Sequence, residues 1–258
     1  MSLVRTQAAV SALFGALVVS MAHAEPSTTA WLQDVAVQPQ HTTQTVLGFE
    51  HHLTDVKARG AGIDFLRARL EAGFLPKASL APEVVFEQRG EEPLRLQEVA
   101  FHARFRALDW QAWPRLMVYG GYANDLGDER DHLLKVGLAG SYDYGGLYLN
   151  ADLRPTLQLG GEQGKALESW TGVAIGYGWA STWQARVGLE SFMIVPWIGE
   201  RTSDPTFGEA AESNTYYYGP SFAFAVGPFW TSVSAVTGYF ISPAASQFLL
   251  SWLAGVGY

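Results

Sequence analysis

Charged side chains recur at every second position in several stretches of this sequence. One such series begins at Arg67 and another at His102, and each contains two arginines that share a side of the chain. Because the arginine fork matches carboxylates and phosphates, these series could guide anionic solutes. The same arginines could instead pair with carboxylates such as Glu87 and Glu98 and brace the fold. Acidic and basic residues are nearly balanced on this polar face, which favours bracing.

A period of two is the pattern of a β-strand with two different faces, because successive side chains point to opposite sides of a sheet. The alternation is cleanest between residues 147 and 160, where leucines alternate with polar residues that include Asp152 and Arg154. The charged residues that share the polar face form the candidate site of the protein. They are Arg67, Arg69, Glu71, Glu87, Glu98, His102, Arg104, Arg106, Lys135, Asp152, Arg154, Arg186 and Glu190.

The chain after residue 41 shows strand and turn patterns and no convincing helix. We predict an all-β fold, a transmembrane antiparallel up-and-down β-barrel of about 12 strands, since single-chain bacterial barrels have even strand numbers. The polar face must point inward, because a lipid-facing Lys or Arg at mid-bilayer costs about 2–4 kcal/mol. The expected strands are 42–53, 63–75, 80–89, 94–108, 115–126, 132–144, 147–160, 167–179, 183–197, 214–226, 229–242 and 245–258.

The connections between strands test this arrangement, because residues paired across a hairpin turn share a face. The tight turns predict three apolar pairs: Tyr144 with Leu147, Trp179 with Trp183, and Val226 with Phe229. Connections after even-numbered strands are short and are predicted to be periplasmic. Those after odd-numbered strands are mostly longer and are predicted to be extracellular, with Ile198–Ser213 the longest.

Two further predictions concern the barrel wall. The strands over 167–179 and 214–258 present mainly small residues inward, which leaves room for a solute, an inserted loop or residues 25–41. Aromatic residues at the strand ends are assigned to girdles in the headgroup regions. The girdle at the predicted extracellular end contains Trp170, Trp197, Tyr216, Tyr218, Tyr239 and Phe248.

The N-terminus has the features of an export signal. Arg5 precedes an apolar run, and Ala22-His23-Ala24 forms an Ala-x-Ala cleavage site. We expect a signal peptide (1–24) cut after Ala24, an irregular N-terminal segment (25–41) and a transmembrane β-barrel (42–258). Charged residues make up 16% of the chain, and there is no cysteine, which excludes disulfide scaffolds and thiol-ligated metals.

Motifs for catalysis, metals and nucleic acids are not found. His51 and His52 point to opposite faces of a strand, so they cannot both bind one metal ion there. His102 and His132 have no serine at a matching strand spacing, and the His-x-Ser-Asn-Gly-like motif of the outer-membrane phospholipase is absent. No Gly-rich phosphate loop, zinc motif or basic nucleic-acid patch occurs. We therefore expect no catalytic residue, no metal, no cofactor and no nucleic-acid partner.

The last strand resembles the C-terminal strand of Gram-negative outer-membrane β-barrels. Tyr258, Val256 and Trp252 share its apolar face, and the sequence ends on the aromatic residue. The resemblance implies that these three residues form a signal for the barrel-assembly machinery. It also implies periplasmic chaperones, outer-membrane lipids and lipopolysaccharide as partners.

A second resemblance involves the first hairpins. The stretch Leu47–Asp55, followed by Phe65–Glu71, resembles the hairpin of proteobacterial barrels labelled transporter-like or phenol-degradation-pathway outer-membrane proteins. The strand number and the arginine-bearing interior are also similar to those of the oligogalacturonate and sialic-acid porins, whose interior is more consistently basic. These resemblances imply a location in the bacterial outer membrane.

Three functions follow from these patterns. The first is a narrow, porin-like channel for small solutes, with anions as candidates. The second is a closed structural or accessory barrel with a salt-bridged or plugged lumen, which binds a partner through its extracellular loops. The third is a lipid-modifying outer-membrane enzyme. We expect a protein that is not an enzyme.

Overall fold

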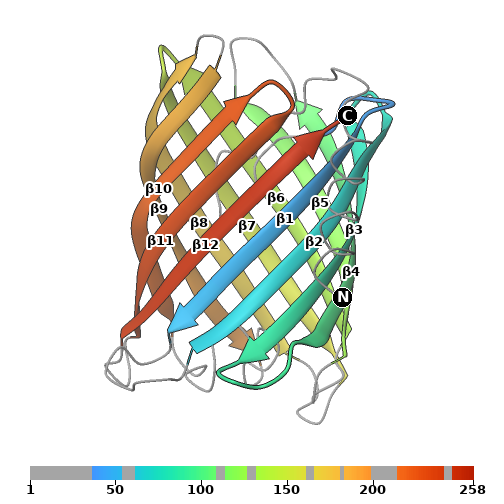
Figure 1. Cartoon of the computed structure of the whole chain (residues 1–258), viewed down its shortest axis with the longest axis vertical. Helices are drawn as coiled ribbons and strands as arrows, with labels where there is room; N and C mark the ends of the chain where they lie inside the picture. The colour runs from blue at the N-terminus through green and yellow to red at the C-terminus, as the bar shows by residue number, and fades with distance from the viewer. Residues whose placement is uncertain are drawn as a thin grey trace, which may run out of the picture.

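The computed structural model describes residues 37–53, 62–108, 114–126, 132–160, 166–180, 183–198, 214–240 and 246–258. Over these residues the chain forms a closed barrel in which strands adjacent in sequence pair antiparallel and the last strand pairs with the first (Figure 1). This confirms the predicted all-β up-and-down fold. The strands are β1 (Thr43–Leu53), β2 (Gly62–Leu75), β3 (Ala78–Arg89), β4 (Arg95–Leu108), β5 (Arg115–Asp125), β6 (His132–Tyr144), β7 (Leu147–Leu159), β8 (Ala166–Ala180), β9 (Trp183–Ile198), β10 (Thr215–Val226), β11 (Phe229–Phe240) and β12 (Ser246–Gly257).

Burial alternates along the strands with the period that the sequence predicts. In β7, Leu149 and Leu153 are exposed on the outside of the barrel, whereas Asn150 and Asp152 are buried inside it. The same outward exposure of large apolar side chains recurs around the barrel, at Leu47, Phe101, Val136, Ile175, Leu189 and Phe222. A continuous apolar surface of this kind suits contact with lipid rather than water.

The hairpin register keeps the two faces continuous. Tyr144 pairs with Leu147 across a turn whose two glycines, Gly145 and Gly146, have positive φ angles of 57° and 92°. Val226 pairs with Phe229, also as predicted. The third pair differs, because Trp179 lies opposite Ala185 and not Trp183. A shift of two residues leaves each side chain on its expected face, so the alternation survives the error.

The two ends of the barrel differ in their connections. At one end, which we call the short-turn end, residues 76–77, 145–146 and 227–228 join consecutive strands. The opposite end, the long-loop end, carries the connections 54–61 and 199–214. The predicted long loop Ile198–Ser213 lies almost wholly outside the described residues, and so does the predicted signal peptide. The described residues contain no helix long and apolar enough to cross a membrane.

The residues before β1 lie inside the short-turn end. Val37 is buried in a cluster with Met117, Tyr119 and Ala139, which are inward-facing residues of β5 and β6. The chain then turns at Pro39–Thr42, where the Thr42 amide donates to the Pro39 carbonyl oxygen at 3.1 Å, before it enters β1. Residues 25–36 of the expected N-terminal segment lie outside the described residues.

Candidate functional site

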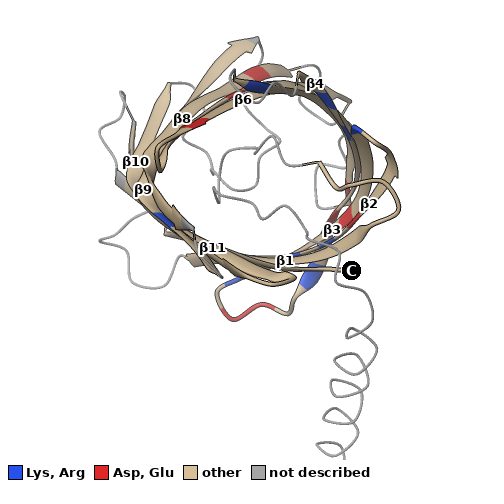
Figure 2. Cartoon of the chain, turned by 90° about the horizontal axis from the view of Figure 1, so that it is seen from above, with Lys and Arg blue, Asp and Glu red and all other residues tan. Residues whose placement is uncertain are grey.

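The interior of the barrel has two unlike walls. The inner face of β1–β7, which we call the charged wall, carries most of the candidate residues. Figure 2 looks into the barrel and marks the charged residues along its strands. The inner face of β8–β12, which we call the aromatic wall, carries few charges, and β10, β11 and β12 contain no Lys, Arg, Asp or Glu. All thirteen candidate residues lie on inward-facing positions of their strands, but the barrel does not bring them together at one point.

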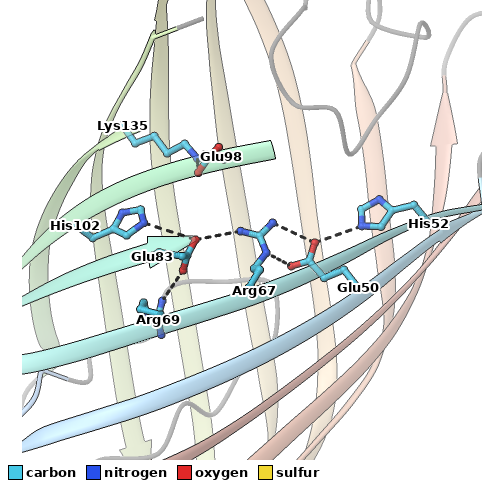
Figure 3. Close-up of polar contacts among 8 residues, drawn as sticks. All are labelled: Glu50, His52, Arg67, Arg69, Glu83, Glu98, His102 and Lys135. Carbon is cyan, nitrogen blue, oxygen red and sulfur yellow. Dashed lines mark hydrogen bonds and ion pairs between the residues drawn. The ribbon is translucent and has the colours of Figure 1, made fainter. Parts of the chain in front are cut away.

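Glu83 is the centre of the charged wall (Figure 3). Its carboxylate lies 3.4 Å from Arg67 Nη1, 3.8 Å from Arg69 Nη1 and 3.8 Å from His102 Nε2. These partners come from β2 and β4, the strands on either side of β3. One carboxylate therefore bridges three neighbouring strands and neutralises part of the charge of two arginines.

Glu50 extends this network to β1. Its carboxylate lies 2.9 Å from Arg67 Nε and 3.3 Å from His52 Nε2, so Arg67 stands between two carboxylates (Figure 3). Glu50 and His52 are absent from the predicted candidates because Glu50-His51-His52, directly after Phe49, makes the alternation of the first expected strand irregular. The alternation nevertheless holds in the structure, where Val46, Glu50 and His52 lie on one buried face of β1, so their shared parity is the signal that could have found them.

Two smaller ion pairs belong to the charged wall as well. Arg104 Nη1 donates to Glu71 Oε2 at 3.1 Å, and the Ser79 hydroxyl donates to Glu71 Oε1 at 2.6 Å. Lys135 Nζ lies 3.6 Å from Glu98 Oε1. Both pairs link different strands, β2 with β4 and β4 with β6. The candidates therefore form compensated pairs between strands, which is the geometry that bracing requires.

The remaining candidates have other contacts. Asp152 accepts a hydrogen bond from the Tyr119 hydroxyl at 2.6 Å, and Glu87 pairs with Arg89. The guanidinium of Arg154 lies 4.5 Å from the centre of the Trp170 ring, and that of Arg186 lies 5.1 Å from the centre of the Tyr148 ring. Arg106 faces inward on β4, and Glu190 is fully buried on β9. Arg186 also reaches Asp143, at 3.4 Å.

The aromatic wall is a packed cluster of rings and aliphatic side chains. Trp170 stacks on Phe192 with ring centroids 5.6 Å apart, and Phe192 stacks on Tyr217 at 4.7 Å. The Tyr217 hydroxyl donates to Gln247 Oε1 at 2.7 Å. These rings are buried inside the barrel, so the assignment of Trp170 to the outer girdle is wrong. Trp170 lies on the inner face because it shares the parity of Gly172 and Ala174.

Several glycines of this wall lie directly against neighbouring aromatic rings. A Cβ added at Gly238 would come within 2.3 Å of the Tyr217 ring, and one at Gly255 within 2.3 Å of the Trp230 ring. Gly176 and Gly188 are covered in the same way by Tyr148. At these four positions the absence of a side chain on glycine makes space for a neighbouring aromatic ring, and that ring occupies the space.

One pair on the outer face bears on the enzymatic alternative. His51 Nδ1 lies 2.5 Å from Asp64 Oδ1, and both side chains are partly exposed near the long-loop end. Within the described residues this pair has no serine partner. The described residues also contain no group of three or more His, Cys, Asp or Glu side chains that could hold a metal ion.

Comparisons with known proteins identify the fold. No protein-family model matches the sequence, and no curated protein matches it either. Among solved structures, the chain is similar to the COG4313 outer membrane channel from Pseudomonas putida F1, with a TM-score of 0.63, 11% identity, and coverage of 87% of this chain and 98% of that one. It is also similar to the NanC porin (TM-score 0.53, 7% identity, 82% and 98% covered). A third similar structure is LpxR from Salmonella typhimurium (TM-score 0.51, 9% identity, 82% and 99% covered). The chain therefore has the fold of outer-membrane β-barrels, as its C-terminal strand suggested.

Proposed function

We propose that this protein is exported to the bacterial outer membrane and forms a narrow channel whose passage follows the charged wall and favours small anions. Its apolar outer face, its fold and the signal-like N-terminus support the location. In this location the outer face contacts membrane lipids and lipopolysaccharide, and the strand that ends with Trp252, Val256 and Tyr258 is the part offered to the assembly machinery.

The observation that carries the proposal is the unequal exposure of the two partners in the ion pairs. Arg67 keeps 29% of its side-chain surface accessible, whereas its partners Glu50 and Glu83 keep 6% and 8%. The Lys135 side chain keeps 23% of its surface accessible, and its partner Glu98 keeps 13%. In these pairs the cations project into the interior and the carboxylates lie against the wall. Although the charges nearly balance, a solute that passes Arg67 or Lys135 therefore meets the positive end of the pair first.

The test uses one ion pair and both of its members. We expect Lys135→Gln to shift the reversal potential of the refolded protein in a planar bilayer under a KCl gradient away from anion preference. Glu98→Gln should shift it in the opposite direction, because it removes only the recessed charge. Lys135 is a sharper probe than Arg104, which is buried against Glu71. Discrete channels whose selectivity is the same in both variants would contradict the proposal.

The closed, braced barrel is the second candidate, and a specific observation favours it. Most of the charged pairs on the inner face join side chains from different strands, and the opposite wall is packed with buried rings. In that case the bilayer stays silent for the wild type and both variants, while each variant lowers the free energy of unfolding. The same pair of substitutions therefore separates the two functions.

A further inference from the structure

We propose that residues 37–42, which we call the entry strap, form a gate across the short-turn end of the interior, and that release of the strap widens the passage. This inference rests on the proposed channel. The strap begins at Val37 against the inner faces of β5 and β6 and ends at Thr42, next to the start of β1. In the barrel order, β2, β3 and β4 lie between those two places, so the strap leaves the wall and crosses the interior.

Gly73 of β2 is the main anchor of the strap. The His41 amide donates to the Gly73 carbonyl oxygen at 2.9 Å, and the Gly73 amide donates to the Thr42 carbonyl oxygen at 2.9 Å. The backbone of Pro39 lies so close that a Cβ on residue 73 would stand 2.0 Å from the Pro39 carbonyl oxygen. Only glycine permits this approach, because no flexible side chain is available to move aside.

Val37 is the second anchor. Its side chain is 3% exposed and packs with Met117, Tyr119 and Ala139 on the far wall. Tyr119 itself is fixed by its hydrogen bond to Asp152 and by its ring, which lies against Gly137. The strap is therefore attached at both ends, and on the far wall it is held by the apolar packing of Val37.

Other features oppose this attachment. Gln38 is buried and donates to Gln44 Oε1, but its own Oε1 has no donor among the described residues. A buried acceptor without a donor loses its hydration and gains nothing in return. His41 has a φ of 65°, a left-handed conformation that residues with a Cβ adopt at a cost. Both features lower the stability of the seated strap relative to a released one, as a gate requires.

A reversible cross-link tests the position of the strap and its effect together. The chain has no cysteine, so the double variant Val37→Cys, Ala139→Cys contains the only two thiols. We expect a disulfide to form under mild oxidation, as shown by loss of titratable thiols in the refolded protein. The oxidised protein should conduct less than the same protein after reduction, since the disulfide holds the strap in the interior.

A glycine pair provides the second measurement. Gly73→Ala should displace the strap and raise the single-channel conductance of an otherwise unlinked protein. Gly120→Ala is the matched control, because a Cβ there would meet nothing closer than the Lys135 carbonyl oxygen at 3.7 Å. We expect its conductance to match that of the wild type.

The outcomes separate the gate from the channel. Conducting channels without disulfide formation would overturn the strap and leave the channel standing. Disulfide formation with equal conductance before and after reduction, and no effect of Gly73→Ala, would show that the strap is seated but does not gate. A protein that cross-links and stays silent in every state would overturn both the channel and the gate.

Discussion

The charged wall and the aromatic wall follow the same alternation of inward and outward residues but are built in different ways. On the charged wall, side chains meet as ion pairs between strands, and the cationic ends of Arg67 and Lys135 remain accessible. On the aromatic wall, rings stack and are buried to 8% exposure or less. The comparison shows that a period of two determines which way a side chain points. It does not determine whether the inward side chains leave an open surface.

The two walls should therefore contribute different properties. Ion pairs with an accessible member add less to stability than the same pairs would if both members were buried and well hydrogen-bonded, because water screens them and their long side chains lose entropy. Stacked rings bury large apolar areas and gain from their stacking geometry. We expect the aromatic wall to supply most of the rigidity of the interior and the charged wall to supply its electric field.

The largest expected effect comes from the centre of the aromatic wall. Phe192→Ala removes the ring that stacks on both Trp170 and Tyr217, and it should lower the free energy of unfolding by about 3–5 kcal/mol. Urea titration of the protein in detergent micelles measures this loss. Leu189→Ala, on the outward face of the same strand, is the control and should cost clearly less. Equal losses in the two variants would contradict the contrast between the walls.

An intermediate effect is expected from the centre of the charged wall. Glu83→Gln leaves Arg67, Arg69 and His102 without their shared carboxylate, and it should cost about 1.5–3 kcal/mol. In the same variant, anion preference in a planar bilayer should rise, because the arginines are less compensated. Phe192→Ala should leave anion preference unchanged. A selectivity change confined to the aromatic-wall variant would reverse the roles assigned to the two walls.

The smallest expected effect separates stacking from hydrogen bonding on the aromatic wall. Tyr217→Phe keeps the ring and removes the hydroxyl that donates to Gln247, so it should cost about 0.5–1.5 kcal/mol in the same urea titration. A loss as large as that of Phe192→Ala would mean that polar contacts, rather than stacked rings, hold this wall together.

The sequence was sufficient for the fold because alternation is a local property. The leucines of β7 indicated the lipid face before any contact was known, and the Tyr144–Leu147 pair confirmed that neighbouring strands share it. The contents of the interior were harder to predict. Trp170 and Phe192 meet only through the register of β8 and β9, and Tyr217 covers Gly238 only through the register of β10 and β11. Such contacts depend on three-dimensional packing, which a period of two does not encode.

The candidate site shows the same division. The sequence predicted the inward direction of Arg67 and Lys135, but not which partner each would meet or how exposed each would remain. Arg67 contacts Glu50 because β1 lies beside β2, and β1 was the strand with the least regular pattern. The seating of Val37 against Met117 could not be predicted, because it joins an irregular segment to strands far along the chain.

The pairing of β1 with β12 has a consequence for the way this molecule is made. The two strands pair from Gln44 with Gly257 to Leu53 with Phe248, and Thr43 and Tyr258 exchange backbone hydrogen bonds of 2.7 and 2.8 Å at the last rung. These contacts join the two ends of the sheet, so they can form only after the whole sheet has been synthesised. Until then both strands expose unpaired N–H and C=O groups, which are templates for aggregation. The pairing of β1 with β12 therefore removes the last unpaired strand edges, at which the chain could aggregate with other chains. It is also the last strand pairing that can form during synthesis.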